Sequence, residues 1–308
     1  PPLTLGARRP SNTPESRARL SRRGRAEARI SDPLDAPSGG KQASAMLIRQ
    51  LPLAFAIFAS ACGGSSEGGP AKTRLQDATL CATHNSYSGG TRGSIVAQLD
   101  GGIRFVELDA YWDADYFAVG HDGPGDMVEL GGDNPASTEL NAWVETLATW
   151  TKAHPRHAVI TVGLDAKGDF EDAQVEELES IFRNAFGNAL VEPEELGGEM
   201  PFVEDLNGRV IAVLSGNLSL RKRYKNDERL FFVEYQNGDP DDLKSLFWAT
   251  SAFDFASVAD WPAAGAVIRL WGVNDDFVLE PTHVTYAATD TPFVDWYKDY
   301  CESSDAFR

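Results

Sequence analysis

The chain has 308 residues, of which 42% are hydrophobic and 24% charged, which fits a globular protein and excludes a disordered or collagen-like chain. It carries 28 Lys and Arg against 46 Asp and Glu, a formal net charge of −18, so we expect no nucleic acid among its partners. The charge is uneven: residues 1–61 hold ten basic and four acidic residues, which leaves 18 basic and 42 acidic residues, a net charge of −24, in the rest of the chain.

Residues 1–45 contain no Met and no apolar periodicity, but they are rich in Arg, Pro and Ser, so they cannot form a hydrophobic core. We interpret this stretch as sequence upstream of the true start that is never made. The alternative is a disordered basic arm that binds a nucleic acid or a membrane. We prefer the first interpretation because the first Met, Met46, begins a segment with a complete organisation of its own.

The segment from Met46 reads MLIRQLPLAFAIFASACGGSSEGG, with one cation, a short apolar run and then small residues before Cys62. This layout predicts a secretory signal peptide over 46–61, since the apolar run is too short to span a bilayer. The small residues before Cys62 resemble a bacterial lipobox, which implies cleavage before Cys62 and acylation of that residue. The alternative is an ordinary signal peptide that is cleaved near Ala61. A Gly- and Ser-rich start predicts a flexible tether over 62–77.

Short apolar, β-rich runs alternate with helical stretches from residue 78 onward, and the helical stretches are Thr138–Ala153 and Phe170–Phe186. The predicted strands are Ala78–Thr83, Ile103–Ala110, Tyr116–His121, Ala158–Leu164, Arg209–Leu214, Leu230–Glu234, Ala266–Trp271 and Val284–Ala288. Eight strands with helical crossovers in about 250 residues predict an α/β fold, a (β/α)8 TIM barrel, as a single domain over 78–308. A doubly wound open sheet is the alternative, but no GxGxxG turn follows the first strand.

Polar residues follow or close the first four predicted strands, where a barrel of this kind places its functional groups. They are His84 and Asn85 after the first strand, Glu107 and Asp109 in the second, His121 in the third and Asp165 after the fourth. Glu107 and Asp109 stand two residues apart, so their carboxylates project from one face of the strand and repel unless a cation lies between them.

Three carboxylates and the amide oxygen of Asn85 form a set of hard oxygen donors that suits Ca²⁺, with Mg²⁺ as the second choice. The two histidines can transfer protons or hydrogen-bond a phosphate. The remaining histidines close no predicted strand, so we interpret them as packing or surface residues.

Six segments together resemble the phosphatidylinositol-specific phospholipase C-like phosphodiesterases, closest to their bacterial calcium-dependent branch, over roughly residues 79–293. The segments are ATHNSY (82–87), GIRFVELDAYWD (102–113), VGHDG (119–123), AHPRHAVITVGLDAK (153–167), MPFVEDLNGRVIAVL (200–214) and THVTYAATDTPF (282–293). The resemblance implies a phosphoric diester hydrolase or lyase with the same barrel. It implies Ca²⁺ ligands at Asn85, Glu107, Asp109 and Asp165, with His84 and His121 as the catalytic pair.

In the mechanism that the resemblance implies, a substrate hydroxyl next to the phosphodiester attacks phosphorus while His121 protonates the leaving oxygen. Lys167 and Arg269 would add positive charge around the phosphate, and Trp271 would line the mouth of the site. Asp165 stands where the family more often has Glu, a side chain longer by one methylene group, which leaves the metal distance open.

Three functions compete on these residues. The first is a Ca²⁺-dependent phosphodiesterase that cleaves a phosphodiester lipid, anchored as a monomer to a bacterial cell envelope, at the outer membrane or cell surface, through acylated Cys62. The second is a glycerophosphodiester phosphodiesterase or a sphingomyelinase-D-like lipase on the same barrel. The third is a non-catalytic surface lipoprotein that binds a head group or a glycan. Cys81 and Cys301 could form a disulfide, since the first and last strands of a closed barrel are neighbours; free thiols are the alternative.

Overall fold

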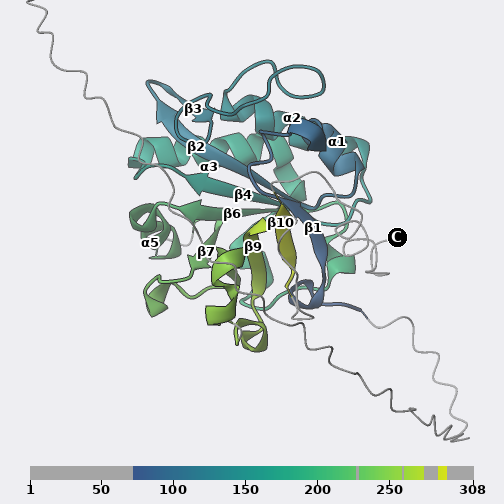
Figure 1. The fold of residues 1–308 in the computed structure, drawn as a ribbon, viewed down its shortest axis with the longest axis vertical. Helices are drawn as coiled ribbons and strands as arrows, with labels where there is room; N and C mark the ends of the chain where they lie inside the picture. The colour runs from purple at the N-terminus through teal and green to yellow at the C-terminus, as the bar shows by residue number, and fades with distance from the viewer. Residues whose placement is uncertain (1–71, 227–228, 259, 274–283, 290–308) are drawn as a thin grey trace, which may run out of the picture. The chain divides into compact units, whose positions relative to one another are not determined.

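Eight parallel strands close into a barrel (Figure 1). The computed structural model describes residues 72–226, 229–258, 260–273 and 284–289, and the barrel lies within them. The strand order is β1, β10, β9, β8, β7, β6, β4 and β2, and a β1–β2 pairing closes the ring, which confirms the predicted (β/α)8 barrel. The barrel strands are β1 (Leu80–Thr83), β2 (Phe105–Asp113), β4 (Ile160–Ala166), β6 (Val210–Gly216), β7 (Phe232–Gln236), β8 (Phe247–Ser251), β9 (Val267–Val273) and β10 (Tyr286–Thr289).

One predicted strand lies outside the barrel, so its assignment as the third barrel strand was wrong. The segment predicted over 116–121 forms β3 (Tyr116–Val119), which pairs antiparallel with the end of β2. Only Ala114 and Asp115 connect the two strands, whereas a parallel crossover takes a dozen residues or more. Ala114 has a φ of 57°, in the left-handed region that tight hairpin turns use.

One barrel strand, β8, was not predicted. Its sequence, FWATS, has only two large apolar residues and ends in Thr and Ser, so the hydrophobic pattern there is weak. Backbone pairing on both sides holds this segment as a strand, because β8 pairs in parallel with β7 and with β9. The predicted total of eight barrel strands is therefore right only because one wrong strand and one missed strand cancel.

Helices cover the outside of the barrel, and Figure 1 shows α2 and α3 along β2 and β4, with α5 beside β6 and β7. The helices are α1 (Ile95–Asp100), α2 (Leu140–Ala153), α3 (Asp172–Phe186), α4 (Pro193–Leu196) and α5 (Leu218–Asn226). Short 3-10 turns are Leu75–Asp77, Gly90–Arg92, Gly187–Ala189, Val203–Leu206, Asp241–Leu243, Ala252–Val258 and Trp261–Ala264, and a two-residue strand β5 (Leu190–Val191) pairs with β6. Both predicted helices are confirmed as α2 and α3, and Glu171 caps α3 reciprocally with Gln174.

Alternation along β2 separates the core from the site. Val106, Leu108 and Ala110 pack outward in the layer between strands and helices, whereas Phe105 packs in the second apolar cluster, inside the barrel. The next residues on the inward face are Glu107 and Asp109, both buried. Because side chains alternate with a period of two, the same face is apolar at the start of the strand and acidic at its end.

The apolar floor of the barrel is tightly packed beneath these carboxylates. A Cβ atom on Gly163 of β4 would lie 2.5 Å from Cζ of the Phe105 ring, so only glycine leaves room for that ring. The hydroxyl groups of Thr161 and Tyr286 share a hydrogen bond of 2.8 Å on the same floor. These residues thus fill one end of the barrel, and the polar groups lie at the other end.

Cys81 on β1 is disulfide-bonded, and its strand pairs with β10 as expected; the predicted partner, Cys301, lies outside the described residues. The signal peptide and Cys62 also lie outside them, so those remain predictions. Within the described residues, no helix is both long enough and apolar enough to cross a bilayer.

Candidate active site

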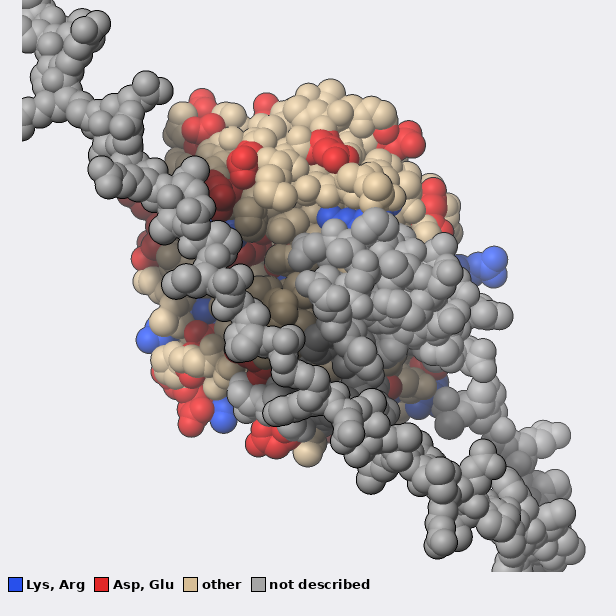
Figure 2. All heavy atoms as spheres, in the orientation of Figure 1, with Lys and Arg blue, Asp and Glu red and all other residues tan. Residues whose placement is uncertain are grey.

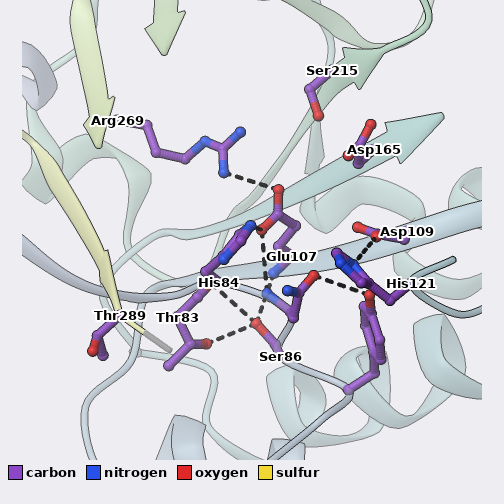
Figure 3. A network of polar contacts seen from close by, with 12 residues as sticks. Thr83, His84, Ser86, Glu107, Asp109, His121, Asp165, Ser215, Arg269 and Thr289 are labelled. Atoms are coloured by element: carbon purple, nitrogen blue, oxygen red, sulfur yellow. Dashed lines mark hydrogen bonds and ion pairs between the residues drawn. The ribbon is translucent and has the colours of Figure 1, made fainter. Parts of the chain in front are cut away.

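The charged side chains predicted for the site meet at the carboxyl ends of the barrel strands (Figure 3). Asp109 of β2 is in register with Asp165 of β4, which is in register with Ser215 of β6. A cavity of about 330 Å³ opens here, within the size range of small-molecule sites. Its lining residues are His84, Glu107, His121, Asp165, Gln236, Asn237, Ala249, Thr250, Ser251, Asp254, Arg269 and Trp271.

The predicted site residues outside this lining stand directly behind it. The backbone N–H of Asn85 donates to Glu107 Oε2 over 3.3 Å, and Asp109 contacts His121 and Lys167. The structure therefore brings together all nine residues that the sequence proposed for the catalytic, metal-binding and substrate-binding roles.

Three carboxylates form the centre of the site. One oxygen each of Glu107, Asp109 and Asp165 lies within 4.8 Å of the others, and the first two residues are buried. Burial, together with the charges of Glu107 and Asp165, raises the pKa of Asp109 to about 6, although Lys167 acts in the opposite direction. The expected repulsion between the paired carboxylates is thus present, and it acts mainly on Asp109.

Glu107 escapes this effect because a buried guanidinium neutralises it. Arg269 on β9 donates from one terminal nitrogen to Glu107 Oε1 over 2.9 Å. It also donates two hydrogen bonds of 2.8 Å to the carboxylate of Glu234 on β7. Burial alone would raise the pKa of Glu107, but Arg269 and His84 hold it below its ordinary value. The guanidinium of Arg269 therefore binds two carboxylates, and its effect on the site is to keep Glu107 ionised.

Lys167 provides the second positive charge. Its ammonium lies 2.9 Å from Asp109 Oδ2 and 2.8 Å from Asp165 Oδ2. These two carboxylates raise its pKa above the ordinary value even though burial acts to lower it. Lys167 is thus a charged group that bridges two of the three acidic residues predicted as metal ligands.

The turn after β1 presents His84 and Asn85. Asn85 has a φ of 46°, and Arg92, which is buried, donates to the carbonyl oxygens of both His84 and Asn85. Tyr87 donates from its hydroxyl group to the Asn85 side-chain oxygen over 3.0 Å, which leaves that oxygen a second lone pair. His84 Nε2 lies 3.5 Å from Glu107 Oε2, and its ring is 5.8 Å from that of Trp271.

His121 reaches the cavity from the loop after β3. Its Nδ1 lies 3.4 Å from Asp109 Oδ2, and the Tyr111 hydroxyl donates to its backbone carbonyl over 2.7 Å. The turn is tight, because a Cβ atom on Gly120 would lie 2.0 Å from the carbonyl oxygen of Gly123. The structure places His121 at the cavity even though its strand does not belong to the barrel.

These donors fit a divalent cation of the hard kind. The three carboxylates offer oxygen ligands within reach of one ion, and no soft sulfur ligand is part of the described cluster. The cluster also holds more acidic than basic side chains. Its four acidic residues, Glu107, Asp109, Asp165 and Glu234, pair with only two cationic residues, Arg269 and Lys167. One divalent cation would balance the remaining charge.

This chain resembles known proteins in structure rather than in sequence. No family model matches the sequence, and no curated protein matches it. A calcium-dependent phosphoinositol-specific phospholipase C from a Gram-negative Pseudomonas sp superposes with a TM-score of 0.62 at 19% identity, covering 77% of this chain and 94% of that one. The chain therefore shares the fold of this enzyme.

A second solved structure of this fold is a Ca²⁺-dependent phosphatidylinositol-specific phospholipase C from Streptomyces antibioticus. It superposes with a TM-score of 0.57 at 17% identity, covering 76% of this chain and 98% of that one. At such identities the similarity establishes the barrel fold, while the roles of individual residues depend on the geometry of the site.

Three residues that support this site were not predicted from the sequence. Glu234 closes a predicted strand, so the rule that selected Glu107 and Asp109 could also have selected it. Arg92 and Tyr87 stand near the first strand in the sequence but carry no motif. Only tertiary contacts show that they hold the turn with His84 and Asn85.

Proposed function

We propose that this protein is a Ca²⁺-dependent phosphodiesterase that cleaves a phosphodiester lipid in the manner of a phospholipase C. One observation carries the proposal: two histidines and two carboxylates of the three-carboxylate cluster line one cavity at the functional end of this barrel, with the third directly behind them. The two solved structures of the same fold are named as calcium-dependent enzymes of this type, which supports both the reaction class and the metal.

The chemistry assigned to the chain is proton transfer and charge stabilisation around phosphorus. A hydroxyl group of the substrate, next to the phosphodiester, attacks phosphorus, and the bond to the lipid oxygen breaks. Glu107, held ionised by Arg269, accepts the proton of the attacking hydroxyl directly or through His84, which lies 3.5 Å away. His84 also hydrogen-bonds a phosphoryl oxygen.

His121 supplies the proton for the leaving oxygen. Asp109 faces its Nδ1 and so orients the ring, and Nε2, which lies 4.0 Å from the exposed carboxylate of Asp122, is the proton donor. Asn85, Glu107, Asp109 and Asp165 are the residues that would hold Ca²⁺, which when bound stabilises the negative charge on the phosphoryl oxygens. Trp271 lines the mouth beside His84, where a head group would enter.

The test is a panel of phosphodiesters, presented to the full-length protein with Ca²⁺ or with chelator. Release of a cyclic inositol phosphate from phosphatidylinositol vesicles supports the proposal. Release of glycerol 3-phosphate from glycerophosphodiesters would assign the site to a glycerophosphodiester phosphodiesterase instead. Cleavage of a choline lipid alone would point to a sphingomyelinase-D-like lipase, and absence of all cleavage would favour a non-catalytic lipoprotein.

Histidine variants sharpen this test. Replacement of a positioned general acid or base costs about 100-fold or more in rate, so His84→Ala and His121→Ala should each lose at least that much. His154→Ala is the matched control, because His154 follows α2, stacks on Trp150 and is absent from the cavity. Full activity in chelator, or in the double variant of His84 and His121, contradicts the proposal.

We further propose that acylated Cys62 tethers the protein to a bacterial envelope as a monomer. The lipobox-like residues before Cys62 support this, and so does the net charge of −24 beyond residue 61, which disfavours electrostatic attraction to an anionic bilayer. Figure 2 shows acidic side chains spread over the visible face of the described residues, with fewer basic ones among them. Mass spectrometry of the N-terminal peptide, and release of a Cys62→Ala variant from membranes, test the anchor.

A further inference from the structure

We infer that Lys167 is a resident counter-ion of the carboxylate cluster and competes with the divalent cation for two of its ligands. The inference rests on the proposed function and deepens it. Lys167 Nζ lies 2.9 Å from Asp109 Oδ2 and 2.8 Å from Asp165 Oδ2, which are two of the three acidic ligands predicted for the metal. Metal binding therefore includes the displacement of this ammonium from its partners.

Neighbouring strands hold the three groups in this arrangement. The backbone N–H of Lys167 donates to the carbonyl of Ala110 on β2 over 2.9 Å, so the end of β4 is fixed against the strand that carries Asp109. Gly216 on β6 has a φ of 77°, and a Cβ atom there would lie 2.0 Å from Asp165 Oδ1. One oxygen of Asp165 is thus packed against β6, and the other faces the ammonium.

A metal ion and the ammonium cannot use these oxygens at the same time. Ca²⁺ binds oxygen at about 2.3–2.6 Å, so an ion shared by Asp109 Oδ2 and Asp165 Oδ2 would occupy nearly the same place as Nζ. Two positive charges at such a distance repel strongly in a buried site. Asp109 is almost completely buried, with a side chain that is 2% exposed, so it cannot turn away to solvent to relieve the conflict.

Lys167 itself can move. Its side chain is 22% exposed and has a flexible four-carbon stem, whereas Arg269 is held by two buried carboxylates. Asp165, which it contacts, lines the cavity where a phosphodiester would bind. The displaced ammonium then lies within reach of the phosphate, so metal and phosphate each favour binding of the other.

The experiment is a calorimetric titration of Ca²⁺ into the full-length protein, first alone and then with diethyl phosphate as the probe for the phosphodiester. Lys167→Met removes the charge and keeps a long side chain, Lys167→Gln is a second neutral variant, and Lys167→Arg keeps the charge. Lys152→Met, on the exposed end of α2, is the matched control for loss of one positive charge elsewhere.

We expect both neutral variants to bind Ca²⁺ about tenfold more tightly or better, while Lys167→Arg and Lys152→Met stay close to wild type. Diethyl phosphate should tighten Ca²⁺ binding in the wild type and not in Lys167→Met. The Ca²⁺-induced rise in Tm, which also reports on a variant of low stability, should be larger in the neutral variants.

The inference and the proposed function fail in different ways. If the wild type binds Ca²⁺ and the neutral variants bind it equally or more weakly, the competition is refuted while the metal site stands. If only the neutral variants bind Ca²⁺, the competition is supported and the proposed Ca²⁺ dependence is overturned. If no variant binds Ca²⁺, the metal site and the inference fall together.

Discussion

Removal of the buried guanidinium at Arg269 should be the most damaging single change in the site. Arg269→Met keeps the apolar stem and leaves two buried carboxylates without their partner, since the side chains of Glu107 and Glu234 are 4% and 2% exposed. Breaking a buried ion pair by removing one partner typically costs about 3–5 kcal/mol. We expect a loss of that size in the free energy of unfolding at pH 7, in chelator.

Protonation limits this cost. A buried carboxylate can take up a proton instead of staying charged, at about 1.36 kcal/mol for each pH unit above its ordinary pKa of about 4.3. The free energy of protonating a buried Glu, which is the upper limit of its cost to stability, is about 3.7 kcal/mol at pH 7 and about 1 kcal/mol at pH 5. Without Arg269, the pKa of Glu107 lies above its unfolded value, so the folded variant gains stability as pH falls. In the wild type the pKa of Glu107 is lowered, so its contribution is present at neutral pH and is lost in acid.

The assay is urea unfolding followed by tryptophan fluorescence, at pH 7 and pH 5, with chelator present. Lys72→Met is the matched control, because Lys72 pairs with Asp205 where both side chains are half exposed, and such pairs contribute about 1 kcal/mol or less. The reasoning is refuted if Arg269→Met loses less than about 1 kcal/mol at pH 7, or if its deficit is as large at pH 5 as at pH 7.

Two further predictions concern Asp109 and the barrel floor. Because the pKa of Asp109 is raised to about 6, protons should compete with Ca²⁺ below that pH. The Ca²⁺ affinity measured by calorimetry should then fall by up to about tenfold per pH unit. A constant affinity between pH 7 and pH 5 would contradict the raised pKa. Gly163→Ala should lower the free energy of unfolding by about 1–3 kcal/mol, because the added methyl group meets the Phe105 ring. Gly123→Ala, with open space around its Cβ position, is the control, and an equal loss in both variants would contradict the packing argument.

The site was largely predictable from the sequence because barrel strands obey a simple positional rule. Functional groups lie at the carboxyl ends of the strands, so Glu107, Asp109 and Asp165 could be selected once the strands were located. The rule worked less well where strands are short or mixed in composition, as in β8. It also selected His121 although β3 is a hairpin strand, because a two-residue turn brings the chain back to the same end of β2.

The sequence by itself determined the barrel class, the grouping of carboxylates and histidines, and the composition of a cluster of hard oxygen donors, because alternation and strand ends are local properties of the chain. Tertiary structure decided which charges neutralise one another. Glu234, Arg269 and Glu107 stand on three different strands, and Lys167 bridges two carboxylates from β2 and β4. Such pairings depend on the register between strands distant in sequence, and they control which carboxylate stays ionised and which cation the cluster holds.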